Sequence, residues 1–179
     1  MPRNIEIKAK VHDFKQLLET SSQLSDTKEA VLVQHDVFYK VTNGRLKLRS
    51  REEDGKKESE LIFYSRPDGD GPKLSDFTVS PVPDFDTMNT ALTSSCGVKG
   101  EVKKERHLFM VGQTRVHCDK VTDLGEYMEL EVMLKDGQSE KEGMDIAECL
   151  MMQLGISKSD LVSGAYLDLK DKLGVHSEK

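Results

Sequence analysis

The sequence predicts an α+β fold in which about eight strands close into an antiparallel β-barrel with flanking helices. Short runs of alternating polar and apolar residues predict the strands, because alternate side chains of a strand lie on one face. Turn signals such as Asn43-Gly44 separate the runs and favour hairpins. In several runs the polar face is charged throughout, as in Arg45-Leu-Lys47-Leu-Arg49. A charged face that recurs along the chain favours a closed barrel or tunnel, which encloses it, over an open sheet.

The predicted strands follow one another with short connections, as in a series of hairpins. Turns are indicated at Asp54-Gly55, at Gly112-Gln113 and at Asp123-Leu124-Gly125. Pro81 and Pro83 end the fifth strand, because proline has no backbone N–H for a sheet hydrogen bond. Strands are expected over residues 4–11, 31–41, 45–52, 58–66, 77–82, 100–111, 114–122 and 126–134.

Helical patterns occupy the remaining long segments. Asp13 is suited to cap a helix that begins at Phe14. A second helix is expected over about 85–95, and two more over 140–154 and 158–173. Residues 67–76 are rich in glycine and proline, which predicts a mobile loop.

The composition excludes several functional classes. A length of 179 residues fits one domain, expected over 1–175, and a net charge of −6 argues against a general nucleic-acid binder. The three cysteines are far apart, which predicts buried free thiols rather than disulfides or a zinc site. No stretch approaches the ~18 apolar residues of a membrane span. We therefore expect a cytoplasmic protein with no membrane or nucleic-acid partner. The motifs G-x-x-x-x-G-K-[ST] and G-x-G-x-x-G are absent from the sequence, so a P-loop or Rossmann nucleotide site is not indicated.

Basic residues share faces in several predicted strands. Arg45, Lys47, Arg49 and Arg51 alternate with Leu46, Leu48 and Ser50, so they point to one side. A solvated strand face explains any one such run, whereas several like-charged strands are costly unless an anion binds there. Arginine and lysine are the usual ligands of phosphate oxygens. Further cations on other strands or near them are Arg66, Lys73, Lys104, Arg106 and Arg115.

Acidic residues form a second set, made of Glu6, Asp119, Glu129 and Glu131. Clustered carboxylates repel one another unless a proton or a cation lies between them. Such oxygen ligands suit Mg²⁺ or Mn²⁺ together with substrate phosphates. The alternative is an ordinary pair of strands joined by salt bridges. His117 could serve as a base, although a hydrogen-bonded structural histidine is the commoner case.

The motifs occur in an order that resembles the CYTH family, also called triphosphate tunnel metalloenzymes. Asn4-Ile-Glu6-Ile-Lys8 is similar to the family's N-terminal E-x-E-x-K motif, and a similar strand follows at 34–39. The other similar segments are Arg45-Leu-Lys47-Leu-Arg49, Leu61–Asp68, Lys104-Glu-Arg106, Arg115-Val-His117-Cys-Asp119, Leu124–Glu131 and Gly164–Leu169.

The resemblance implies an eight-stranded antiparallel tunnel that binds triphosphate compounds with a divalent metal. Metal ligands would then be Glu6, Glu129 and Glu131, with Asp119 as an additional acidic partner and Mg²⁺ or Mn²⁺ as the ion. Lys8 would act with Glu6 in catalysis, beside the attacking water or the scissile phosphate, and Lys73 would act from a mobile lid. Residues implied to bind substrate phosphates are Lys8, Arg45, Lys47, Arg49, Arg66, Lys73, Lys104, Arg106 and Arg115.

The chain departs from the family motif at Asn4, where the family usually has a glutamate. An uncharged amide in that place predicts a weaker metal site. The chain also has no tryptophan on which to stack a thiamine ring. Hydrolysis of inorganic tripolyphosphate to pyrophosphate and phosphate is therefore the expected activity. A thiamine triphosphatase, a class IV-type adenylyl cyclase and a non-catalytic polyphosphate-binding module remain alternatives, and the protein is expected as a monomer or homodimer.

Overall fold

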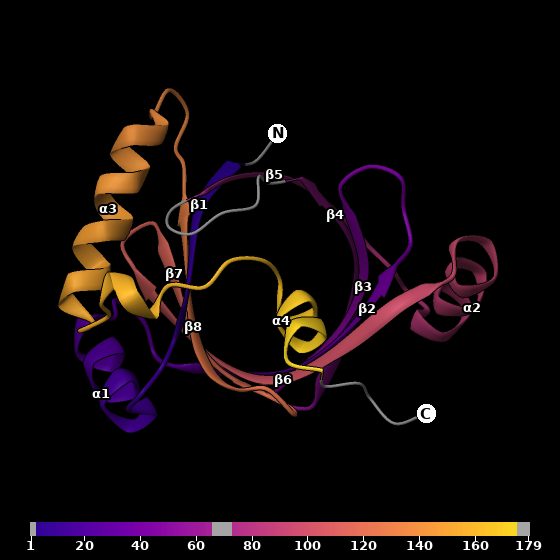
Figure 1. Cartoon of the computed structure of the whole chain (residues 1–179), viewed down its shortest axis with the longest axis horizontal. Helices are drawn as coiled ribbons and strands as arrows, with labels where there is room; N and C mark the ends of the chain where they lie inside the picture. Colours follow the sequence, from indigo (N-terminus) through magenta and orange to yellow (C-terminus); the bar gives the residue numbers. More distant parts are fainter. Residues whose placement is uncertain (1–2, 66–72, 175–179) are drawn as a thin grey trace.

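The computed structural model describes residues 3–65 and 73–174 and shows a closed barrel of eight antiparallel strands with helices around it (Figure 1). The strands are β1 (Arg3–Lys10), β2 (Ala30–Tyr39), β3 (Arg45–Glu53), β4 (Lys56–Ser65), β5 (Lys73–Pro81), β6 (Val98–Val111), β7 (Thr114–Val121) and β8 (Gly125–Met133). The helices are α1 (Phe14–Leu24), α2 (Phe85–Cys96), α3 (Glu140–Gln153) and α4 (Tyr166–Lys172), with a 3-10 turn at Lys158–Asp160. The predicted fold class is confirmed.

The ring order of the strands is β1-β5-β4-β3-β2-β6-β7-β8. Hairpins join β2 to β3, β3 to β4, β4 to β5, β6 to β7 and β7 to β8, and β1 pairs with both β5 and β8 to close the ring. Two neighbours in this closed ring, β8 and β1, therefore lie across the barrel from β3 and β2. Closure leaves no unpaired strand edge.

The outward faces of the strands carry apolar residues, which the helices cover. On one side α1 and α3 pack on β1, β7 and β8, where Ile5, Leu130 and Ala147 are fully buried (Figure 1). On the opposite side α2 packs on β2 and β3 around Val37 and Leu48. The hydrophobic core therefore lies mainly outside the barrel, which leaves the inner faces of the strands to charged residues.

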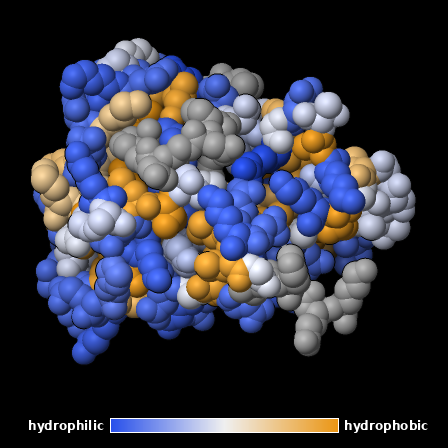
Figure 2. Space-filling model, in the orientation of Figure 1, coloured by the Kyte–Doolittle hydropathy of each residue, from blue (hydrophilic) through white to orange (hydrophobic). Residues whose placement is uncertain are grey.

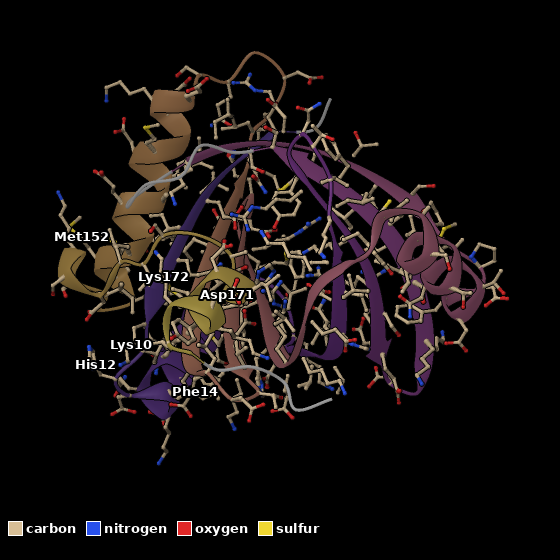
Figure 3. All side chains as sticks on the ribbon, turned by 45° about the vertical axis from the view of Figure 1, so that its right-hand side comes forward. Lys10, His12, Phe14, Met152, Asp171 and Lys172 are labelled. Atoms are coloured by element: carbon tan, nitrogen blue, oxygen red, sulfur yellow. The ribbon has the colours of Figure 1, made fainter. Side chains whose placement is uncertain are left out.

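One end of the barrel is filled by α4, which lies within the ring of strands in Figure 1. Its Leu167 and Leu169 pack with inward-facing residues such as Phe38, Val102 and Tyr127. Gly100 in β6 makes room for this helix, because a Cβ there would lie 2.5 Å from Leu167 Cδ1. In Figure 3 the labelled Asp171 and Lys172 mark the C-terminal end of α4, whereas Met152 projects from α3 on the outside of the barrel.

The structure corrects two predictions. The helix expected over 158–173 is interrupted between the 3-10 turn and α4, because Leu161 bridges Ala9 of β1 and Val162 N–H donates to Lys8 O at 3.0 Å. Lys73 belongs to β5 rather than to a loop, and it lies opposite Glu6. Residues 67–72 of the expected loop lie outside the described residues, and so does Arg66.

Cys96, Cys118 and Cys149 are free thiols, as predicted, but burial is confirmed only for Cys118, because Cys96 is half-buried and Cys149 is exposed. Cys118 is fully buried in β7, and burial raises the pKa of its thiol to about 12. Within residues 3–65 and 73–174, no helix combines the length and the apolar character needed to cross a membrane.

Candidate functional site

The inner faces of the strands line a cavity inside the barrel, and hydrophilic residues surround a hollow near the middle of the face shown in Figure 2. All eight strands contribute to its wall, and Tyr166 at the start of α4 contributes as well. Residues predicted as site residues that line this cavity are Glu6, Lys8, Lys47, Arg49, Lys104, Arg106, Arg115, Glu129 and Glu131.

A basic wall is organised around one carboxylate, Asp36 on β2, which is 2% exposed. Arg49 donates from Nε and Nη2 to its two oxygens at 2.7 Å each. Lys47 Nζ donates at 3.2 Å, and Lys104 Nζ lies 3.6 Å from Oδ2. Lys47 and Arg49 lie opposite Phe38 and Asp36 in the β2–β3 register, whereas Lys104 comes from β6 on the other side of β2. Three cations therefore share one buried carboxylate.

The electrostatics of the basic wall follow from burial. Burial alone would raise the pKa of Asp36, but Arg49, Lys47 and Lys104 together hold it well below its usual value. Burial lowers the pKa of Lys104 to about 7, because Asp36 offsets only part of the cost of a charged amine in this place. The Lys104 amine is therefore expected to take up a proton when an anion binds to the basic wall.

Lys104 leads to a prediction about pH. Near pH 8 the Lys104 amine is mostly neutral, and a bound polyanion raises its pKa, so tripolyphosphate binding takes up a proton there. As the pH falls through the pKa of about 7, the free amine becomes charged and this uptake declines. Calorimetric titration with tripolyphosphate, without metal and in buffers of different ionisation enthalpy, measures the number of protons taken up on binding. We expect this number to be larger for the wild type than for Lys104→Met, by up to about one proton.

The neighbouring Lys103, which is exposed on the outer face of β6, provides the matched control. Lys103→Met should take up protons like the wild type. Equal proton uptake by Lys104→Met and the wild type at pH 8 would contradict the assignment.

The acidic wall lies across the barrel, on β8 and β1. Glu129 and Glu131 face the cavity from β8, opposite Lys8 and Glu6 of β1 in the register. Among the described residues, the acidic and histidine side chains that come within 4.8 Å of one another as a potential metal site are His117, Glu129 and Glu131. Glu6 lines the same cavity and is adjacent in register to Glu131, although it is not a member of that group. The opposed basic and acidic walls that the sequence predicted are thus both present.

The carboxylates of the acidic wall are held ionised. Burial would raise the pKa of Glu129, but Lys8 and Arg106 outweigh it and hold the pKa well below the usual value. The pKa of Glu131 is also lowered, because His117 and Arg106 outweigh burial. Two ionised carboxylates on adjacent inward positions of one strand provide the oxygen donors that a divalent cation requires.

Lys8 stands at the boundary between the acidic wall and the end filled by α4. Its Nζ lies 3.0 Å from Glu129 Oε1, donates to Gly164 O at 2.9 Å and lies 4.2 Å from the centroid of the Tyr166 ring. Gly164 has φ of +86°, a conformation that favours glycine. The side chain of Lys8 is therefore fixed by three groups, and its ammonium is directed at the acidic wall.

Asp119 has a different environment from the one predicted. Its two oxygens accept 2.7 Å hydrogen bonds from Nε and Nη2 of Arg106, which lies opposite it in the β6–β7 register. The Tyr166 hydroxyl donates to it at 2.6 Å, and Arg106 also pairs with Glu129 at 2.9 Å. Asp119 therefore braces Arg106 against the acidic wall and lies outside the group of three potential metal ligands. A direct metal-binding role for Asp119 stays a prediction.

Other predicted residues are placed as follows. Arg45 pairs with Asp168 of α4 at 2.6 Å and is not among the described residues that line the cavity. Arg115 does line it, and its side chain is 45% exposed beside Glu131. Asn4 also lines the cavity, and its buried Oδ1 has no hydrogen-bond partner within the described ranges. Their roles toward phosphate or metal stay predictions.

Two important residues, Asp36 and Tyr166, were absent from the predicted site. They occur in the family-like segments 34–39 and Gly164–Leu169, which are the signal that could have found them. A third, His117, is predicted from the sequence only as a possible base. Its position two residues from Asp119, opposite Glu129, becomes informative only once the strand register is known.

The donor set fits a divalent cation. Glu129 and Glu131 offer anionic oxygens, and His117 Nδ1 close to them and Asn4 Oδ1 in the same cavity as the glutamates have no hydrogen-bond partner in the described part of the chain. Buried polar atoms normally have partners, so atoms without one in a cavity lined by carboxylates fit a site for a ligand. Glu129 and Glu131, with Glu6 nearby, are the residues that would hold such an ion.

The chain resembles solved structures over nearly its full length. A protein from Pyrococcus horikoshii OT3 is 20% identical, with a TM-score of 0.80 over 93% of this chain and 98% of that one. A candidate adenylate cyclase from Vibrio parahaemolyticus is 18% identical, with a TM-score of 0.74 over 94% and 97%. A candidate adenylyl cyclase from Hippeastrum, described as having a dominant triphosphatase activity, is 16% identical, with a TM-score of 0.67 over 97% and 96%. These similarities show the shared fold.

Sequence comparison leads to the family. No curated protein sequence matches the chain. The profile of the CYTH domain matches residues 2–166, which include every strand of the barrel and end at the first residue of α4. The chain therefore belongs to the CYTH domain family.

Proposed function

We propose that this protein hydrolyses a triphosphate compound with the help of a divalent metal ion, and that inorganic tripolyphosphate is its substrate, cleaved to pyrophosphate and phosphate. The observation that carries the proposal is the grouping of Lys47, Arg49 and Lys104 around Asp36, which leaves cationic charge in excess in a buried place. Excess buried charge is costly unless a counter-charge binds. A linear polyphosphate supplies that charge along the wall.

The residues have complementary tasks in this reaction. Lys47, Arg49, Lys104 and Arg106 bind phosphate oxygens and stabilise the charge that spreads over them in the transition state. Glu129 and Glu131 would hold the metal ion, Mg²⁺ or Mn²⁺, which when bound would supply charge neutralisation and a polarised water. Lys8, held by Gly164 O and Tyr166, orients the attacking water or the scissile phosphate.

Hydrolysis of an organic triphosphate is the second candidate. Phe77 and Val79 of β5, with Ile62 of β4, give the cavity an apolar side that tripolyphosphate does not need. Such a surface suits the organic group of thiamine triphosphate or of a nucleotide. The Hippeastrum relative is described as an adenylyl cyclase candidate with dominant triphosphatase activity, which supports hydrolysis over cyclisation as the main reaction.

A substrate panel tests the proposal. The purified protein is given tripolyphosphate, thiamine triphosphate or ATP with Mg²⁺ or Mn²⁺, and both released phosphate and cyclic AMP are measured. We expect phosphate release to be fastest from tripolyphosphate. The variant Glu131→Gln, which should lose activity, controls for contaminating phosphatases. Phosphate release from none of the three compounds would instead favour a non-catalytic polyphosphate-binding module.

We also propose that the reaction takes place in the cytoplasm. The observation in support is that all three cysteines, Cys96, Cys118 and Cys149, are free thiols. Free thiols are usual in a reducing compartment. Detection of the tagged protein in cell fractions tests this, and recovery of the protein from an oxidising compartment would contradict it.

A further inference from the structure

His117 is a buried histidine whose Nδ1 makes no hydrogen bond within the described residues. The residue is 4% exposed on the inner face of β7, opposite Glu129 in the β7–β8 register. Its Nδ1 has no hydrogen-bond partner among the described residues. An unsatisfied buried polar atom costs about 1–3 kcal/mol, so a structural histidine would normally find a partner for it.

The nitrogen lies within ion-pair distance of two carboxylates but is hydrogen-bonded to neither. Nδ1 lies 3.8 Å from Glu129 Oε2 and 3.9 Å from Glu131 Oε1, which is too far for a hydrogen bond to either. It faces both carboxylates at nearly equal distance, and the three ligand atoms lie within 4.8 Å of one another. Ligand atoms that are each about 2.0–2.2 Å from one metal ion lie roughly 3–4.4 Å apart, so a small inward movement of these side chains would let all three contact one ion.

A second buried atom without a partner among the described residues lies in the cavity that Glu129 and Glu131 line. Asn4 is 5% exposed and lines the cavity, and its Oδ1 has no hydrogen-bond partner in the described part of the chain. Because an amide replaces a carboxylate here, the acidic wall has fewer anionic oxygens for the ion. His117 on β7 would add a nitrogen ligand to the oxygen ligands Glu129 and Glu131, which makes a mixed nitrogen and oxygen site.

We infer that His117 Nδ1 is a direct ligand of the divalent metal ion, together with Glu129 and Glu131, and that this mixed nitrogen and oxygen site prefers Mn²⁺ to Mg²⁺. Imidazole suits transition-metal ions, whereas Mg²⁺ prefers sites made of oxygen alone. The inference rests on the proposed function only in requiring that a divalent ion binds in the cavity.

Electron spin-echo spectroscopy of the Mn²⁺-loaded protein tests the inference without measuring activity. A coordinated imidazole nitrogen modulates the Mn²⁺ echo, and selective ¹⁵N labelling of histidine shifts that modulation. We expect the modulation in the wild type and its loss in His117→Gln. The matched control is His107→Gln, because His107 lies on the outer face against Phe14 and Glu29 and its replacement should leave the signal unchanged.

Binding titrations provide the second measurement. His117→Gln should weaken Mn²⁺ binding by about tenfold or more, while Mg²⁺ binding changes much less. Preserved Mg²⁺ binding also shows that the variant is folded.

Three results would overturn the inference. The first is Mn²⁺ bound to the wild type without nitrogen modulation, which would leave the proposed metal-dependent hydrolysis standing. The second is modulation that persists in His117→Gln. The third is a wild type that binds no divalent ion, with or without tripolyphosphate, which would overturn the metal dependence of the proposed function as well.

Discussion

Replacing Asp36 with alanine should lower the free energy of unfolding by about 3–5 kcal/mol, the usual cost of removing one partner from a buried ion pair. The carboxylate is 2% exposed and pairs with Arg49, Lys47 and Lys104. Without it, Arg49, Lys47 and the Lys104 amine are buried next to one another with no carboxylate to pair with, and keeping the lysines charged becomes more costly. Urea denaturation of the wild type and of Asp36→Ala, in buffer without phosphate or metal, measures the difference.

The same variant distinguishes charge pairing from simple packing. Tripolyphosphate should stabilise Asp36→Ala by more than it stabilises the wild type at equal concentration, because the polyanion replaces the missing counter-charge. The additional change Lys104→Met should restore part of the lost stability, because it removes a buried amine that no longer has a carboxylate partner.

An exposed acidic residue on the same side of the barrel provides the control. Glu58 pairs with Arg51 on β3, but its side chain is 63% exposed. Glu58→Ala should leave the unfolding midpoint nearly unchanged, since exposed ion pairs contribute little. A similar loss in both variants, or none in Asp36→Ala, would show that Asp36 does not hold the basic wall together.

The barrel could be predicted from the sequence because each strand carries its own local signal. The alternation of polar and apolar residues at 45–52 or 126–134 indicates which residues share a face, and Asn43-Gly44 indicates a turn. Neither signal depends on the rest of the chain. The segment 158–173 is different. Its pattern suits a helix, but Leu161 and Val162 pair with β1 instead, which is a tertiary contact that no local pattern contains.

The site could be predicted in its composition but not in its pairings. The alternation placed Glu129, Glu131 and Asp119 on inward faces, which the structure confirms. The strand register decides which carboxylate pairs with a cation of the protein. Asp119 lies opposite Arg106 and pairs with it through both oxygens, whereas Glu131 lies opposite Glu6 and Arg115. The register also brings His117 beside Glu129. Sequence spacing alone does not distinguish a bracing carboxylate from one available to a metal.

Replacing Lys8 with alanine should reduce the turnover number for tripolyphosphate by about 10²–10³, the usual effect of losing one group that stabilises or positions the reacting atoms. Lys8 is 7% exposed and touches Glu129, Gly164 O and the Tyr166 ring, so its ammonium is fixed beside the acidic wall. The basic wall is unchanged in this variant. The Michaelis constant should therefore change much less than the turnover number.

The matched control is Lys10→Ala, two residues further along β1, where the side chain is exposed at the end of the strand (Figure 3). It removes the same charge from the same strand and should leave turnover near the wild-type value. Near-normal turnover in Lys8→Ala would refute the proposed role of Lys8. Equal losses in both variants would mean that the overall charge of β1, rather than the position of the Lys8 ammonium, governs the rate. Because Glu129 keeps its pair with Arg106 in Lys8→Ala, the fold should persist, and a loss of turnover then reports on chemistry rather than on stability.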